Sequence, residues 1–181
     1  MLKRICKGFF ICAMLPVFSS AMAAEVATAD IISCQSGDKL GRAVLIERPS
    51  DQGIKMVKIT IKVGGLTPGA HAVHIHEAGV CQPCGAASGH FDPGPFGMTN
   101  PDGNHPFHSG DLVNIKVKNN GRGRLETVTT RVTLSPGPLS LFDADGSAFI
   151  IHDNADTFCP DGQVSGCAGG SRAACGVIEP M

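Results

Sequence analysis

A short run of alternating apolar and polar residues constrains the fold more than any other feature of the sequence. The run from Lys55 to Val63 places Val57, Ile59, Ile61 and Val63 at every second position. A period of two puts these side chains on one face of an extended strand, whereas a helix would scatter them around its axis. The sequence therefore predicts a half-buried β-strand here.

Similar runs recur along the chain, and no long segment has the 3.6-residue period of an amphipathic helix. The 23 glycines and 12 prolines interrupt the chain too often for long helices. Apolar residues alternate in 113–117 before the turn-like Asn119–Gly123, and Leu125–Leu134 returns from that turn. Five further runs bring the predicted strands to about eight, as in a sandwich or closed barrel: Ala27–Ser33, Gly41–Glu47, Ala70–Glu77, Ser147–His152 and Ala174–Ile178.

The first residues have the order of a secretory signal peptide. Lys3, Arg4 and Lys7 form a basic start, Gly8–Phe18 is apolar, and Ser19–Ala24 supplies small residues before Glu25. The apolar run is too short to cross a membrane as a helix. We expect cleavage near Ala23 or Ala24, so that residues 1–23 are a signal peptide and 24–181 form one exported, periplasmic or secreted, domain.

Removal of the signal peptide makes the chain acidic. The whole sequence carries 15 basic and 16 acidic residues, and three of the basic ones lie in residues 1–23. The remaining balance argues against nucleic acid or an anionic membrane as a partner.

Six cysteines remain in the mature chain, and an even number in an exported protein predicts up to three disulfides. They are Cys34, Cys81, Cys84, Cys159, Cys167 and Cys175. The Cys81–Cys84 spacing also suits a thiolate metal site or a thioredoxin-like motif. The first would need a second such pair and the second a βαβ context, and neither is present. Cys159 and Cys167 enclose a short segment, and we predict that they pair with each other.

Two long segments, Ala78–Gly110 and Asp153–Ala173, lack strand patterns and contain cysteines and histidines. Loops of this length in a β domain are commonly functional. Just before the first loop, His74 and His76 lie two residues apart, so both rings point to one face of a strand. Clustered imidazole and carboxylate groups predict a metal site, and imidazole suits copper and zinc. The other candidate ligands are His90, His105, His108, Asp111 and His152.

Five segments of the chain together closely resemble the secreted, periplasmic copper/zinc superoxide dismutases of bacteria. The segments are 71–77 (HAVHIHE), 88–93 (SGHFDP), 108–112 (HSGDL), 151–156 (IHDNAD) and 170–178 (GSRAACGVI). The resemblance covers essentially the whole mature chain, and their order and spacing match the family. It implies an all-β fold, an eight-stranded Greek-key β-barrel, or immunoglobulin-like sandwich, with two long functional loops.

The resemblance also assigns roles to the candidate residues. It implies copper ligands at His74, His76, His90 and His152, with His90 bridging to zinc and acting in catalysis. His108 and Asp111 would be further zinc ligands. Three positions would act without binding a metal: Arg172 as the catalytic guanidinium beside copper, Asp156 as the carboxylate that orients ligand histidines, and His71 as a structural histidine.

One position departs from the family pattern. A further zinc-ligating histidine normally follows the bridging one by about eight residues, and Met98 occupies that place here. Zinc in a structural site prefers four ligands. His105 is the substitute we expect, because the chain before His108 is longer than usual. The other interpretation is an exposed His105 beside a site that holds copper alone.

The resemblance also implies a disulfide between Cys175 and Cys81, with Cys84 as the alternative partner. Cys34 and the remaining member of the Cys81/Cys84 pair are left open, as is the question of a homodimer.

The resemblance implies dismutation of superoxide to O₂ and H₂O₂ by a redox-cycling copper, with a zinc site that is altered or complete. The alternative function is a non-catalytic copper-binding or copper-buffering protein on the same fold. A purely structural β-sandwich is a third class, but it gives no reason for these histidines to coexist.

Overall fold

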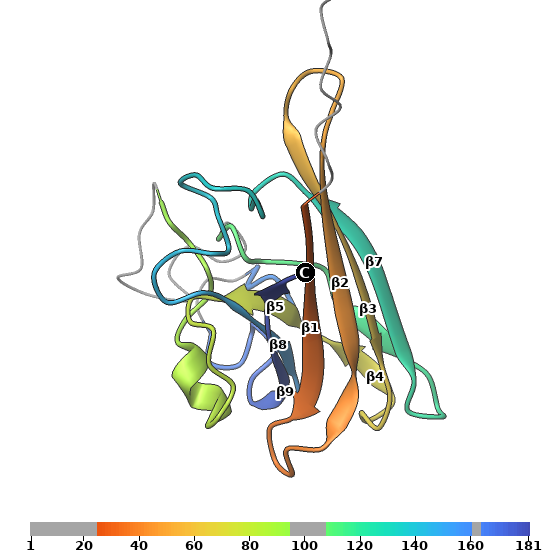
Figure 1. Ribbon diagram of the computed structural model, residues 1–181. Helices are drawn as coiled ribbons and strands as arrows, with labels where there is room; N and C mark the ends of the chain where they lie inside the picture. The colour runs from red at the N-terminus through yellow and green to blue at the C-terminus, as the bar shows by residue number, and fades with distance from the viewer. Residues whose placement is uncertain (1–24, 95–107, 161–163) are drawn as a thin grey trace, which may run out of the picture.

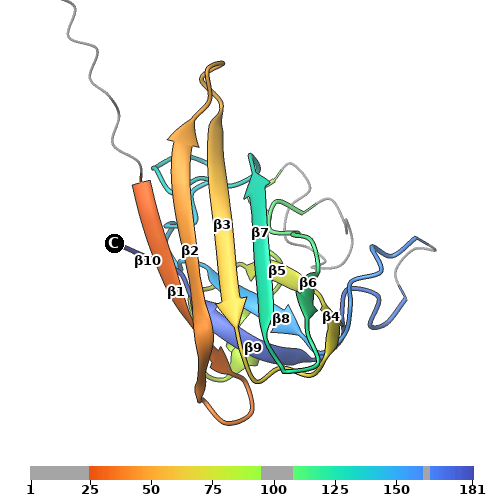
Figure 2. The same ribbon diagram turned by 90° about the vertical axis from the view of Figure 1, so that its right-hand side faces the viewer.

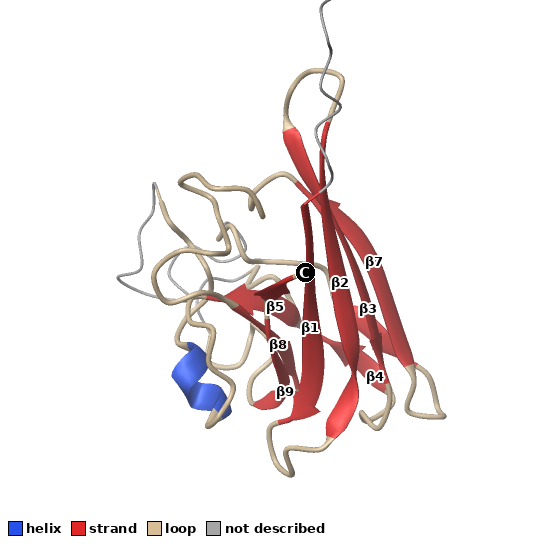
Figure 3. Cartoon of the chain, viewed as in Figure 1, coloured by secondary structure: helices blue, strands red, loops and turns tan. Residues whose placement is uncertain are grey.

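The computed structural model describes residues 25–94, 108–160 and 164–181. In these ranges the chain forms ten strands and one short 3₁₀ helix, η1 (Cys84–Ala87) (Figure 3). The strands are β1 (Glu25–Ser33), β2 (Lys39–Pro49), β3 (Lys55–Val63), β4 (Gly69–His71), β5 (Val73–His76), β6 (Ile115–Val117), β7 (Gly123–Thr129), β8 (Ala148–His152), β9 (Arg172–Val177) and β10 (Glu179–Pro180). No helix within these ranges is long and apolar enough to cross a membrane.

The strands form one antiparallel sheet in the order β4-β6-β7-β3-β2-β1-β9-β8-β5, with β10 added beside β1. Its two end strands, β4 and β5, are consecutive in the chain, so the sheet curls into a nearly closed barrel. Seen from the side, the barrel is flattened: β1, β2, β3 and β7 form the front layer and β5, β8 and β9 cross behind it (Figure 2). The predicted all-β barrel is confirmed.

The alternating run that opened the sequence analysis is β3, a central strand of the front layer. The four alternating apolar residues of this run are buried, and Lys58 and Lys62 between them are exposed. The strand pairs with β2 and β7 over nearly its whole length. The buried side chains between the layers are aliphatic and phenylalanine residues, among them Ile31, Leu45, Ile59, Ile75 and Phe149. Burial of such side chains supplies most of the favourable free energy of folding.

The prediction of one strand over Ala70–Glu77 is wrong in one respect, because the segment divides at Ala72. β4 pairs with β6, whereas β5 pairs with β8. Between them, the backbone of Ala72 donates to the carbonyl of Asn154 and accepts from the amide of His152. The division lets a single segment serve both ends of the sheet and brings His74 and His76 alongside β8.

The predicted strand Leu125–Leu134 also ends early, at Thr129. The hydroxyl of Thr129 accepts from the amide of Arg131 and turns the chain. Beyond it, the buried carboxylate of Glu47 accepts from the amides of Leu134 and Ser135. The Glu47 carboxylate takes the place that a neighbouring strand's carbonyls would have in a sheet. The two backbone amides are therefore hydrogen-bonded although they lie outside the sheet.

The two long loops emerge on the side of the barrel where β5 and β8 lie (Figure 1). One joins β5 to β6 and contains η1, and the other joins β8 to β9. Both therefore begin or end beside the strands that carry His74, His76 and His152.

Candidate metal centre

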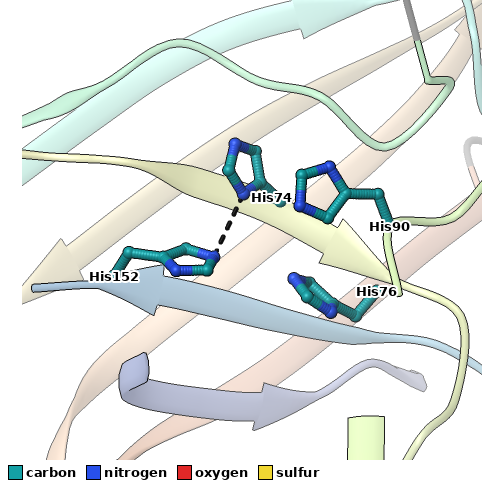
Figure 4. A group of neighbouring side chains, drawn as sticks. All are labelled: His74, His76, His90 and His152. Atoms are coloured by element: carbon teal, nitrogen blue, oxygen red, sulfur yellow. Dashed lines mark hydrogen bonds between the residues drawn. The ribbon is translucent and has the colours of Figure 1, made fainter. Parts of the chain in front are cut away.

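Two groups of buried ligand atoms lie side by side in the described part of the chain. In each group the ligand atoms are within 4.8 Å of one another. The first contains His74, His76, His90 and His152, and the second contains His90, His108 and Asp111. His90 belongs to both. Rings from β5, β8 and the first loop converge on one point (Figure 4).

Backbone pairing with β5 places the candidate ligands of the first loop next to His74 and His76. Isolated bridges join His74 to Asp111 and His76 to His90, so two parts of the first loop flank the strand. Gly110 allows the closest approach, since a Cβ at that position would lie 2.2 Å from the carbonyl oxygen of Ile75. A side chain there would push Asp111 and His108 away from the histidines of β5.

Hydrogen bonds fix which nitrogen of each ring faces the centre. His76 Nδ1 donates to the carbonyl of Ser88 at 2.9 Å, and His152 Nδ1 donates to that of Gly170 at 2.8 Å. His74 uses Nε2 instead, 2.8 Å from the Asp156 carboxylate. The other nitrogen of each ring therefore carries a lone pair: Nε2 in His76 and His152, and Nδ1 in His74. His74 Nδ1 and His152 Nε2 lie 3.1 Å apart.

Burial keeps these rings neutral and therefore able to bind a metal. It lowers the pKa of His74 to about 3, although the hydrogen bond to Asp156 opposes that change. Burial, and then the charges of His90 and Arg172, hold the pKa of His76 well below its usual range. The pKa of His152 is lowered, again chiefly by burial. A metal does not have to displace protons from these three groups near neutral pH.

Asp111 organises the second group. One carboxylate oxygen lies 2.7 Å from His90 Nδ1, and the other accepts from the amide of His108 at 3.0 Å. The second oxygen is also 3.3 Å from His108 Nδ1. His90 thus turns Nδ1 toward Asp111, while its ring is stacked on that of His74 at a centroid distance of 4.0 Å. This geometry suits a ring shared between two metals.

The residues fit the metals that the sequence predicted. His76 Nε2 is buried and has no hydrogen-bond partner among the residues that the structure describes. A buried lone pair without a partner is costly unless it binds something. Four imidazoles suit copper, and two imidazoles with a carboxylate suit zinc.

A cavity of about 640 Å³ opens onto the first group, and its lining includes His76, His90, His152 and Arg172. Within the described lining, Arg172 is the only side chain with a permanent charge. An invariably protonated guanidinium in such a cavity attracts small anions.

Some predicted residues lie elsewhere or outside the description. His71 belongs to neither group, and its ring nitrogens face the carbonyls of His152 and Thr67 at 2.7 and 2.8 Å. Met98 and His105 lie outside the described residues. The carbonyls of Ser88 and Gly170, which orient His76 and His152, were not predicted, because a backbone acceptor leaves no signal in the sequence.

Three disulfides close the loops. Cys81 pairs with Cys175, and Cys159 pairs with Cys167. The two cysteines that the sequence left open, Cys34 and Cys84, pair with each other. All six cysteines of the predicted mature chain are therefore bonded.

Comparisons with known proteins agree with this geometry. Residues 39–178 match the family described as copper/zinc superoxide dismutase. Superoxide dismutase [Cu-Zn] 1 of Aquifex aeolicus is 39% identical over 176 residues, covering 93% of this chain and 96% of that one. Superoxide dismutase [Cu-Zn] of Deinococcus radiodurans is 36% identical over 167 residues, with 84% of each chain covered. The chain belongs to the copper/zinc superoxide dismutase family.

Solved structures give the same result. A double mutant of a SOD-like protein from Bacillus subtilis has a TM-score of 0.61 and 32% identity, covering 82% of this chain and 94% of that one. The family membership predicted from the five sequence segments is confirmed.

Proposed function

We propose that this protein is a superoxide dismutase, which converts two superoxide anions and two protons into O₂ and H₂O₂. The observation that carries the proposal is the convergence of four buried imidazoles, three of which line a cavity that Arg172 also lines. The alternative, a copper-buffering protein, does not explain a guanidinium beside an open cavity, and we do not favour it.

The proposed site holds copper at His74, His76, His90 and His152 and zinc at His90, His108 and Asp111. Copper supplies one-electron redox chemistry there, and zinc, which has no redox chemistry, supplies charge and ligand geometry. Asp156 holds the ring of His74, with a second carboxylate oxygen accepting from the amide of Phe158 at 2.7 Å. Such outer hydrogen bonds fix the orientation of ligand rings.

The protein's own residues bind the anion and move the proton. Arg172 attracts superoxide into the cavity and orients it by charge-assisted hydrogen bonds. His90 lines the cavity, and Asp111 holds its Nδ1 at 2.7 Å. His90 Nε2 would therefore take up a proton when it is not bound to copper and donate it to the second superoxide.

The direct test is a superoxide-consumption assay on the protein loaded with copper and zinc, with metal content measured on the same sample. We expect a kcat/KM close to the diffusional ceiling of about 10⁹ M⁻¹ s⁻¹. The loss of this activity on copper removal, and its return on copper addition, would support the proposal. A fully copper-loaded protein that does not consume superoxide would refute it.

We further propose that His105 completes the zinc site in place of the histidine that Met98 replaces. Three described ligands leave a tetrahedral zinc one short. Replacing His105 with alanine should then lower zinc affinity by at least about tenfold, because losing even an outer-shell partner of a ligand commonly costs that much, and leave copper bound. Equilibrium titration against a chelator measures this. Asn104→Ala is the neighbouring control, and unchanged zinc affinity in His105→Ala would exclude this ligand.

The sequence order of the first residues supports export, with removal of residues 1–23 as a signal peptide and 24–181 as the mature domain. The protein would then act in the periplasm or outside the cell, where disulfides persist. Mass measurement of the exported protein tests this, since a retained Met1–Ala23 segment would contradict cleavage.

A further inference from the structure

The Cys34–Cys84 disulfide connects the barrel to the loop that lines the cavity. Cys34 directly follows β1, and Cys84 begins η1, with 50 residues between them in sequence and 5.7 Å between their Cα atoms. The Cys81–Cys175 disulfide already anchors the same loop to β9. Because the loop is already held to the barrel at Cys81, the second disulfide, three residues further along, mainly fixes the backbone around Cys84.

Arg172 closes a ring of contacts through this disulfide. Its guanidinium donates to the carbonyl of Cys84 at 2.5 Å. On the other side, the amide of Cys34 donates to the carbonyl of Ala173, the next residue after Arg172, at 2.9 Å. The path from Cys34 through the disulfide to Cys84, across to the guanidinium and back through Ala173 returns to its start. The guanidinium of Arg172 and the backbone of the next residue, Ala173, are thus hydrogen-bonded to the two halves of one cystine.

The same segment positions a candidate copper ligand. The guanidinium of Arg172 donates a second hydrogen bond to the carbonyl of Ser88. That carbonyl also accepts from His76 Nδ1 at 2.9 Å. The loop carbonyls therefore set the distance between the charged head of Arg172 and the ring of His76.

We propose that the Cys34–Cys84 disulfide is a positioning element for Arg172, which holds the guanidinium at the anion-binding position beside His76. This inference deepens the proposed function and rests on the role of Arg172 in it. Because Arg172 is the only permanently charged side chain in the described cavity lining, a displaced guanidinium cannot be replaced by a neighbouring cation there. The effect we assign to the disulfide is on the affinity for small anions.

The test is a titration of the copper- and zinc-loaded protein with azide, a small anion, followed by the visible absorption of copper. Replacing both Cys34 and Cys84 with alanine should raise the dissociation constant of azide about fivefold. Arg172→Ala should raise it about tenfold. In the triple variant the constant should equal that of Arg172→Ala, because the disulfide acts through the arginine.

Two results would overturn the proposal. One is a dissociation constant of azide in the triple variant that rises by the product of the two separate effects. The other is an unchanged dissociation constant when both Cys34 and Cys84 are replaced with alanine. Ile59→Val is the control for reduced stability: Ile59 is buried in β3, which β2 and β1 separate from β9, and its azide affinity should match the wild type. If the variant with alanine at Cys34 and Cys84 does not fold, the variant with serine at both positions is titrated in its place. A wild type that binds azide but does not consume superoxide would refute the proposed function alone.

Discussion

Replacing His76 with asparagine is expected to remove copper and to lower kcat/KM for superoxide by more than about a hundredfold, because losing even an outer-shell partner of a metal ligand commonly costs ten- to hundredfold. His76 Nε2 is a buried lone pair that has no hydrogen-bond partner in the described ranges. The shorter asparagine side chain cannot place an equivalent nitrogen there. The three histidines that remain leave copper weakly held.

The measurements are copper content after dialysis against a chelator and superoxide consumption on the same sample. His71→Asn is the matched control, since it changes a buried histidine of β4, the strand that precedes β5 in the chain, and His71 lies outside both ligand groups. We expect His71→Asn to lower stability while keeping copper, because the hydrogen-bond partners of its ring nitrogens are the carbonyls of His152 and Thr67 and the hydroxyl of Thr67, none of which is a candidate metal-binding atom. Full copper occupancy in His76→Asn would remove this residue from the site.

The core of the site was predictable because its residues follow simple periodicities. His74 and His76 alternate on a strand, and alternation places their side chains on one face whatever the rest of the chain does. Their neighbours Val73 and Ile75 occupy the opposite face and pack in the core. The predicted strand over Ala70–Glu77 failed only at Ala72, where the sequence carries no turn residue. Its division depends on pairing with β6 and β8, which are distant in sequence.

Contacts between backbone groups and distant residues could not be predicted. Six cysteines allow 15 pairings, so the sequence alone could not join Cys34 to Cys84. The carbonyls of Ser88 and Cys84 orient His76 and Arg172, yet any residue supplies a carbonyl. Only the loop path defines which ones face the site, and that path depends on the disulfides.

The Cys81–Cys175 disulfide is expected to contribute the largest share of the stability that the three disulfides add, because it closes the longest loop. Replacing both cysteines with alanine should lower the free energy of unfolding by about 4–5 kcal/mol in the chain-entropy description of a cross-link. The reason is the separation of 94 residues, which makes the unfolded chain lose much conformational freedom when the bond is present. Cys175 is fully buried and Cys81 nearly so, and truncation adds the loss of packing.

The Cys159–Cys167 disulfide provides the comparison within the same molecule, because only eight residues separate its cysteines. The same description gives about 2–3 kcal/mol for replacing both with alanine. Urea unfolding of the metal-free proteins measures the two losses without the contribution of bound metal. If the two variants lose equal stability, loop length does not govern the effect, and strain or residual structure in the unfolded chain must dominate instead. The expected order, with the longer link costing about twice as much, would locate the main covalent support of the metal centre between its first loop and β9.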